Sequence, residues 1–325
     1  MPAGQDAALA RPLAERYRTV GGVIQAVRVS IDDHLAAALE TLPLAPGGGI
    51  GRRPEAASQP GFAFPVAQGP MTRVSDRAAF AAAVAEAGAL PFLALALMSG
   101  DEVARLLSEV APMLGTRAWG VGILGFVPPE LREAQLAAVV QARPPYALIA
   151  GGRPDQAAGL EAAGIATFLH VPSPGLLDQF LAGGARRFVF EGSECGGHIG
   201  PRASFPLWEA QVERLLAFGA GRRRDPGAGP EFFTGLEVLF AGGIHDERSA
   251  AMVAALAAPL VAKGASIGVL MGTAYLFTEE AVTSGAILPG FQEAAISCTE
   301  TVLLETAPGH VTRCADTPYV AAFSR

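Results

Sequence analysis

The segment 191–202, EGSECGGHIGPR, concentrates side chains that could carry out chemistry. It contains His198 together with Glu191, Glu194 and several glycines. A histidine in such a loop suits proton transfer near neutral pH, and glycines allow the backbone to approach a flat ligand closely. The alternative is that the polar residues only satisfy the backbone of a turn. We take His198 as the candidate catalytic base.

The other reactive side chains near this loop have plainer interpretations. Cys195 is more typical of a packed thiol than of a nucleophile, because neither a helix N-terminus nor a cation partner is evident. Glu191 and Glu194, three residues apart on a turn, are expected to cap backbone donors rather than act as a carboxylate pair. His170 ends a predicted strand and could face the same site.

Two further glycine-containing loops, AGGIHDE at 241–247 and MGTAY at 271–275, could bind an anion. Their backbone N–H groups can point at a phosphate where a helix begins. The alternative is two ordinary helix caps. The GVGILG run at 120–125 matches GxGxxG by letter, but prolines follow it and no acidic residue lies about 20 residues later, so it does not predict a dinucleotide fold.

Composition excludes several classes of function. The formal net charge of −7 argues against nucleic acid as a partner. Three cysteines without a CxxC pair predict neither disulfides nor a metal site. The N-terminus lacks the apolar core of a secretory signal, and the longest apolar runs are too short to cross a membrane, so we expect a cytoplasmic protein.

From residue 64 onward, short apolar runs alternate with stretches of helical period, which indicates βα units. Eight units in about 210 residues favour a (β/α)8 TIM barrel of α/β class over an open sheet. The predicted strands are 64–69, 90–97, 118–124, 146–150, 166–170, 187–191, 237–241 and 266–271. Lys263, the single lysine, precedes the last strand at the end opposite the expected site, which disfavours Schiff-base chemistry.

The barrel is expected to span 61–285, with two additions. Residues 1–60 form an N-terminal extension with one helix at 31–42 and a Gly/Pro-rich loop. Residues 286–325 form a C-terminal helical or irregular tail that packs on the barrel. A Gly/Arg/Pro loop interrupts the repeat at 219–230.

Four motifs in this order, QGPM (68–71), GSECGGHIG (192–200), AGGI (241–244) and MGT (271–273), resemble the nitronate monooxygenase family, formerly called 2-nitropropane dioxygenases. The pattern is also similar to flavin-dependent enoyl-acyl carrier protein reductases and to flavin domains of polyketide and polyunsaturated fatty-acid synthases. The resemblance covers about residues 62–317.

The resemblance implies an FMN-binding barrel. It places Gln68, Gly69, Pro70 and Met71 along the isoalloxazine ring, Gly242, Gly243, Gly272 and Thr273 at the phosphate, and His198 at the position of the catalytic base. The cofactor-binding residues expected in addition are Gly122, Gly192, Glu194, Gly196 and Gly197, and the substrate is expected at His198 and Arg202.

The sequence departs from the family at two positions of the motifs. Gly122 stands where members often have Asn, which removes one polar contact, and Cys195 replaces an Ala. The continuation PRASFPLWE resembles the synthase-associated branch more than the other members of the family.

Three functions remain open at this point. The first is oxidation of an alkyl nitronate with oxygen, with His198 handling the proton. The second is reduction of an enoyl thioester with NAD(P)H as the electron donor, where Arg202 and the run Arg222 to Arg224 could meet a pantetheine phosphate, an acyl carrier protein or a larger synthase. The third is a flavin-binding docking module without turnover, suggested by Gly122.

Overall fold

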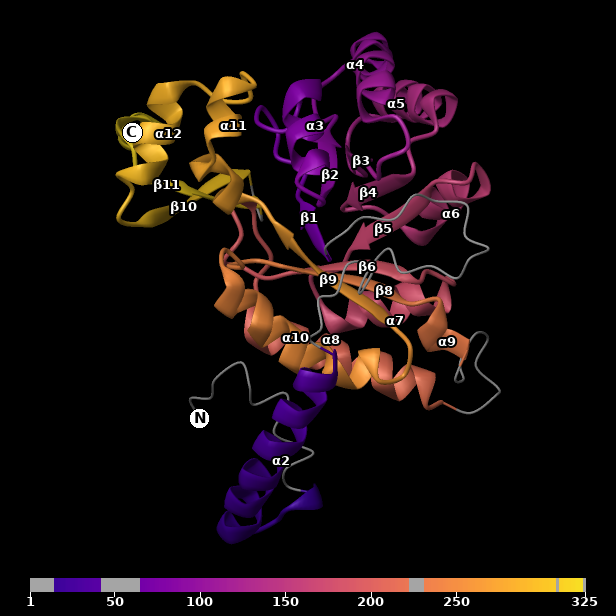
Figure 1. Cartoon of the computed structure of the whole chain (residues 1–325), viewed down its shortest axis with the longest axis vertical. Helices are drawn as coiled ribbons and strands as arrows, with labels where there is room; N and C mark the ends of the chain where they lie inside the picture. Colours follow the sequence, from indigo (N-terminus) through magenta and orange to yellow (C-terminus); the bar gives the residue numbers. More distant parts are fainter. Residues whose placement is uncertain (1–14, 42–64, 222–230, 308–309, 324–325) are drawn as a thin grey trace.

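The computed structural model describes residues 15–41, 65–221, 231–307 and 310–323. Its centre is a closed barrel of parallel strands in the order β1-β2-β3-β4-β5-β6-β8-β9, with helices packed around it (Figure 1). The barrel strands are β1 (Val66–Gln68), β2 (Leu90–Ala94), β3 (Gly120–Leu124), β4 (Tyr146–Ala150), β5 (Ala166–His170), β6 (Arg187–Glu191), β8 (Glu237–Ala241) and β9 (Ser266–Met271). The predicted (β/α)8 fold is confirmed.

The helices follow the strands in sequence. They are α3 (Ala78–Glu86), α4 (Gly100–Leu114), α5 (Pro129–Ala142), α6 (Pro154–Ala162), α7 (Pro174–Ala182), α8 (Ser204–Gly219), α9 (Glu231–Thr234) and α10 (Glu247–Val261), and β9 is followed by η2 (Thr273–Phe277) and α11 (Glu279–Thr283). Capping boxes begin α4 at Ser99 and α10 at Asp246. Proline in the first turn begins α5, α6 and α7.

Strand boundaries agree with the sequence for β4, β5, β6, β8 and β9 and differ for the first three strands. β2 ends at Ala94 rather than at residue 97, because the chain turns at Leu97, whose φ is +67°. β3 begins at Gly120 rather than at 118, and β1 covers only 66–68.

Apolar side chains cover both the inner and the outer face of the barrel strands, as expected for parallel strands that are buried on both faces. Ala67, Phe92, Phe168, Val189 and Leu239 belong to the cluster that fills the barrel interior. A larger cluster joins the outer faces of the strands to the helices.

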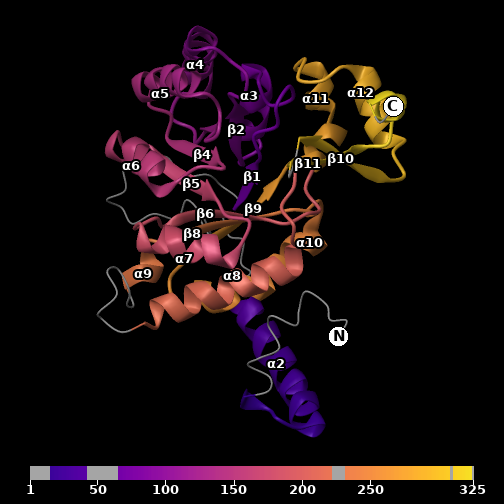
Figure 2. The same cartoon turned by 180° about the vertical axis from the view of Figure 1, so that it is seen from behind.

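The chain before the barrel forms α2 (Val20–Thr41), which is longer than the helix predicted at 31–42. It starts directly after Thr19, whose hydroxyl accepts a hydrogen bond from Gly22 N at 3.0 Å. α2 projects from the barrel beside α10 (Figures 1 and 2). The Gly/Pro-rich loop predicted after it lies outside the described residues.

The prediction of a helical or irregular C-terminal tail was wrong in part. The segment contains α12 (Pro289–Ile296) and α13 (Pro318–Phe323), but between them β10 (Thr301–Ala307) and β11 (His310–Ala315) form an antiparallel hairpin. β11 also pairs with β7 (Gly197–His198), a two-residue strand in the loop after β6. The tail therefore contacts the loop that carries the candidate base.

No helix within the described residues combines the length and hydrophobicity that a membrane crossing requires.

Candidate active site

The His198 loop is held in place from both sides. Gly192 N donates to Ala241 O of β8 at 3.1 Å, and Ile199 N donates to Val311 O of β11 at 3.0 Å. Arg313 on β11 donates from Nε to Ser193 O at 3.0 Å. The loop is therefore fixed by a neighbouring barrel strand and by the C-terminal hairpin, and the geometry of His198 depends on both.

Glu194 caps the helix that follows this loop. Its carboxylate accepts hydrogen bonds from Ser204 N at 2.8 Å and from Ser204 Oγ at 2.6 Å, at the first residue of α8. This confirms the expectation that this carboxylate caps a backbone donor. The negative charge is favourable there, because the N-terminus of a helix carries partial positive charge.

Close glycine contacts bring the predicted loops together at the carboxyl end of the barrel. A Cβ on Gly242, where φ is +102°, would lie 2.6 Å from Ser204 Oγ, and one on Gly243 would lie 3.2 Å from Glu194 Cβ. A Cβ on Gly196 would lie 3.4 Å from Thr273 Oγ1. The loops after β6, β8 and β9 thus meet, and only glycine fits where the backbones approach most closely.

The first strand joins the same group of loops through its last residues. Gly69 N donates to Met271 O at 2.9 Å. A Cβ on Gly272 would lie 3.5 Å from Met71 Sδ. The QGPM and MGT motifs, which are 200 residues apart in sequence, are therefore neighbours at the barrel mouth.

An anionic group fits these loops. Among the described residues, the backbone N–H groups of Gly243 and Thr273 donate to no partner. Both residues are exposed, so these N–H groups are accessible, and an anion such as the phosphate of a flavin can accept hydrogen bonds from them. The predicted assignment of individual phosphate ligands stays a prediction.

Gly122 on β3 packs against Pro70. A Cβ at position 122 would lie 2.2 Å from Pro70 Cβ, closer than any real contact allows. An asparagine therefore does not fit here unless Pro70 moves. The wall formed by these two residues offers no side-chain hydrogen bond.

The side chain of Gln68 does not point toward the barrel mouth. Its neighbour Ala67 belongs to the interior cluster, so strand alternation directs Gln68 toward the helices. Its Nε2 contacts Phe92 O at 3.4 Å, and its buried Oε1 has no partner among the described residues. The predicted ring contact of Gln68 stays a prediction.

His198 is exposed, and its ring packs edge-on against Phe126 with 6.4 Å between ring centroids. Phe126 belongs to the loop after β3, so His198 reaches across the mouth toward that side of the barrel. An exposed imidazole beside an apolar ring can exchange a proton with a bound ligand.

The remaining predicted residues are placed as follows. Arg202 is half-buried, and its carbonyl oxygen accepts from Ser193 N at 2.8 Å. The run Arg222 to Arg224 lies outside the described residues. Cys195 is buried, and burial together with the charge of Glu191 raises the pKa of its thiol well above the usual range. It therefore stays protonated, which fits packing rather than nucleophilic chemistry.

The structure brings together one pair that the sequence analysis did not predict, and Glu191, which was expected to cap a backbone donor, belongs to it. His170 ends β5 and Glu191 ends β6, and His170 Nε2 lies 2.5 Å from Glu191 Oε2. The contact is an ion pair when the imidazole is protonated. Both residues lie at strand ends, but nothing in their spacing indicates that they meet.

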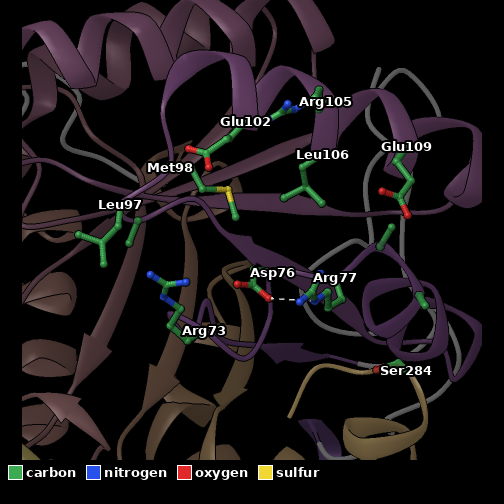
Figure 3. Close-up of a pocket in the computed structure, with 13 residues that line it drawn as sticks. Arg73, Asp76, Arg77, Leu97, Met98, Glu102, Arg105, Leu106, Glu109 and Ser284 are labelled. Atoms are coloured by element: carbon green, nitrogen blue, oxygen red, sulfur yellow. Dashed lines mark ion pairs between the residues drawn. The ribbon is translucent and has the colours of Figure 1, made fainter. Parts of the chain in front are cut away.

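A separate cavity of about 540 Å³ lies beside the mouth, between the loop after β1 and helix α4. Figure 3 shows Arg73 and Asp76 on one side and Glu102 and Arg105 on the other. None of the predicted site residues lines it. Its charges are mixed, so it does not replace the barrel mouth as the candidate site.

Comparison with known proteins supports the assignment of the fold. No protein-family model matches the chain. FabK from Thermotoga maritima has 26% sequence identity and a TM-score of 0.63, covering 79% of this chain and 73% of that one. Nitroalkane oxidase from Streptomyces ansochromogenes has 21% identity and a TM-score of 0.63, covering 80% and 79%, which shows the fold.

A curated relative from Mycobacterium tuberculosis is 29% identical over 246 residues. It is (3aS,4S,5R,7aS)-5-hydroxy-7a-methyl-1-oxo-octahydro-1H-indene-4-carboxyl-CoA dehydrogenase. The match covers 74% of this chain, and the chain spans 60% of the length of that relative.

The closed parallel barrel with glycine-rich loops that meet at its carboxyl end defines a TIM-barrel enzyme class. Within that class the chain is similar in sequence to FabK and to the carboxyl-CoA dehydrogenase, and its barrel has the same fold as nitroalkane oxidase.

Proposed function

We propose that this chain is an FMN-dependent oxidoreductase that acts on the α,β carbon–carbon bond of an acyl thioester. The observation that carries the proposal is the apolar wall of the mouth, where Gly122 contacts Pro70 and Phe126 packs beside His198. Such a wall suits an acyl chain better than a nitro group, which needs hydrogen-bond donors. The carboxyl-CoA dehydrogenase named above supports the same substrate class.

The residues of this chain would hold the cofactor and move one proton. FMN, when bound, would supply hydride chemistry. The loops at Gly242, Gly243, Gly272 and Thr273 would bind its phosphate through backbone N–H groups.

His198 would give or take the proton at the carbon next to the thioester carbonyl. Its loop is fixed by Ala241 and by β11, so the backbone that carries the imidazole is held in place before a ligand binds. Pre-positioning of this kind lowers the entropic cost of the reaction.

Oxidation of an alkyl nitronate is the second candidate, and the exposure of His198 favours it, since an accessible base can meet a small substrate. A docking module without turnover is the third candidate. Its main support was Gly122, and the packing of Pro70 gives that glycine a structural reason. The thioester could be carried by coenzyme A, by an acyl carrier protein or within a larger synthase.

One anaerobic stopped-flow experiment separates the three. FMN-loaded protein is mixed with NADPH and then with crotonyl-CoA, and in parallel with propionate 3-nitronate, while flavin absorbance is followed. Reduction by NADPH and reoxidation by crotonyl-CoA is the expected result. Bleaching by the nitronate alone would assign nitronate oxidation, and no change with any reagent would assign the docking module.

A further inference from the structure

His170 and Glu191 face the inside of the barrel at its carboxyl end. Ala166 and Phe168 on β5 and Val189 on β6 belong to the interior cluster. Because side chains alternate along a strand, His170 and Glu191 share that inward face two residues further on. They therefore lie at the top of the packed interior, where barrel enzymes bind their ligands.

The pair is close and only slightly accessible. The two side chains are 20% and 22% exposed, and His170 Nε2 lies 2.5 Å from Glu191 Oε2. Burial alone would lower the pKa of His170, but the adjacent carboxylate outweighs burial, so the pKa is raised above its ordinary value. His170 therefore carries its positive charge more readily than a free histidine.

One ring nitrogen is left for a ligand. Nε2 is buried against Glu191, whereas Nδ1 makes no hydrogen bond with any described residue and is not sealed from solvent. In a protonated imidazole both ring nitrogens carry a hydrogen. Nδ1 can then donate to a group that occupies the mouth.

The other titratable groups around the pair are already engaged. Cys195 lies beside Glu191 and stays protonated. Glu194 also faces Cys195, and its carboxylate is held by Ser204. Arg313 faces the same thiol and donates to Ser193 O and Thr301 Oγ1. Glu191 is the carboxylate that acts on His170.

We propose that His170 is a second catalytic residue of the site, whose Nδ1–H, positioned by Glu191, donates a hydrogen bond to the substrate oxygen on which negative charge develops. This inference rests on the proposed function for the substrate class, an enolate-type oxyanion of a thioester. A nitronate presents the same chemistry, a planar oxygen anion. A charged donor placed where negative charge develops is an effective form of transition-state stabilisation.

The first test needs neither flavin nor turnover. The protein is labelled with ¹⁵N-histidine, the His170 signals are assigned with His170→Asn, and each histidine is titrated by NMR. His170 is expected to titrate above about 6.5 and to move down in Glu191→Gln. His245 is the matched control, since it is a more exposed histidine 3.7 Å from Asp246 in the loop after β8.

The second test uses nitrate as a planar oxyanion probe. Nitrate should shift the His170 signals and leave those of His34, far away on α2, unchanged. Its affinity should fall about tenfold per pH unit above the His170 pKa, because only the protonated ring donates from both nitrogens. In Glu191→Gln this fall should begin at lower pH.

In activity assays, His170→Leu should lower kcat/KM by about tenfold or more, while His170→Asn, which keeps a neutral donor near the position of Nδ1, should lose less. A normal His170 titration, or nitrate binding that leaves His170 unaffected, would overturn the inference. Absence of turnover with every thioester and nitronate would instead reject the proposed function, and the NMR titrations would still decide the role of His170.

Discussion

The carboxylate of Glu194 accepts hydrogen bonds from Ser204 N at 2.8 Å and from Ser204 Oγ at 2.6 Å, and the same hydroxyl lies 3.0 Å from Gly242 O. This contact links the loop after β6, which carries His198, to the loop after β8. Two segments predicted to bind one ligand are thereby fixed to the first turn of α8.

Replacement of Glu194 by Ala should remove the cap of α8 and loosen both loops. We expect a loss of about 1 kcal/mol in the free energy of unfolding, the usual effect of losing a side-chain cap, together with weaker FMN binding. Urea unfolding and fluorescence titration with FMN measure the two effects. Glu194→Gln keeps an acceptor oxygen, so its free energy of unfolding should lie between those of the wild type and Glu194→Ala. Equal stability of all three proteins would contradict the capping role.

Gly243→Asp should weaken FMN binding. The new side chain would sit in a backbone conformation with φ +76°, 3.2 Å from Glu194 Cβ, and would place a negative charge beside the predicted phosphate. Coulomb repulsion at ~4 Å is on the order of 1 to 4 kcal/mol, depending on the effective dielectric.

The matched control for this change is Gly235→Asp, which adds the same charge at the other end of β8, where a Cβ has open space. It should bind FMN like the wild-type protein. If both variants bind FMN equally, the phosphate lies elsewhere.

Gly122→Asn should destabilise the barrel, because its Cβ would overlap Pro70. Overpacking of this kind costs about 1 to 3 kcal/mol. Pro70→Gly should recover much of that loss in the double variant, and a thermal unfolding series of the four proteins gives the coupling. Strict additivity of the two changes would show that Pro70 does not determine the residue at 122.

His198→Ala should retain the fold and the cofactor but lose turnover. The side chain is exposed, so its removal leaves no core cavity. General-base catalysis contributes about 100- to 10,000-fold, and kcat should fall by that order. The control His34→Ala, on α2, should keep full activity, and a fully active His198→Ala protein would remove His198 from the mechanism.

The His170 and Glu191 pair should make stability depend on pH. The folded-state pKa of His170 is raised, so the pair's contribution is fully present below about pH 6.5 and is lost as pH rises through the folded-state pKa. Urea unfolding of wild type and Glu191→Gln should differ most at about pH 6 and converge in mildly alkaline solution. A difference in the free energy of unfolding between the two proteins that grows with pH would contradict this prediction.

The barrel could be predicted because each βα unit carries local signals. Tyr146–Ala150 and Glu237–Ala241 are apolar runs bounded by turns, and Asp246 begins α10 as a helix cap. The β10–β11 hairpin could not be predicted, because Val302, Leu303 and Leu304 are consecutive apolar residues and show no alternation of apolar and polar types, although Leu303 is exposed between two half-buried neighbours. Its pairing with Gly197 and His198 also joins segments more than 100 residues apart.

The site could be predicted in part for the same reason. Glycine-rich loops at strand ends are visible in the sequence, so the convergence of Gly196, Gly243 and Gly272 follows from barrel topology. The packing of Gly122 on Pro70 and the approach of His170 to Glu191 depend on side-chain positions in three dimensions. Neither contact has a signature in residue spacing.

The central claim is that the mouth of this barrel binds FMN, and analysis of the purified protein tests it most directly. The protein, incubated with excess FMN, desalted and then denatured, should release about one FMN per chain into the supernatant, identified by chromatography and by its visible spectrum. Release of FAD after incubation with both flavins, or a colourless protein that retains no flavin, would contradict the account.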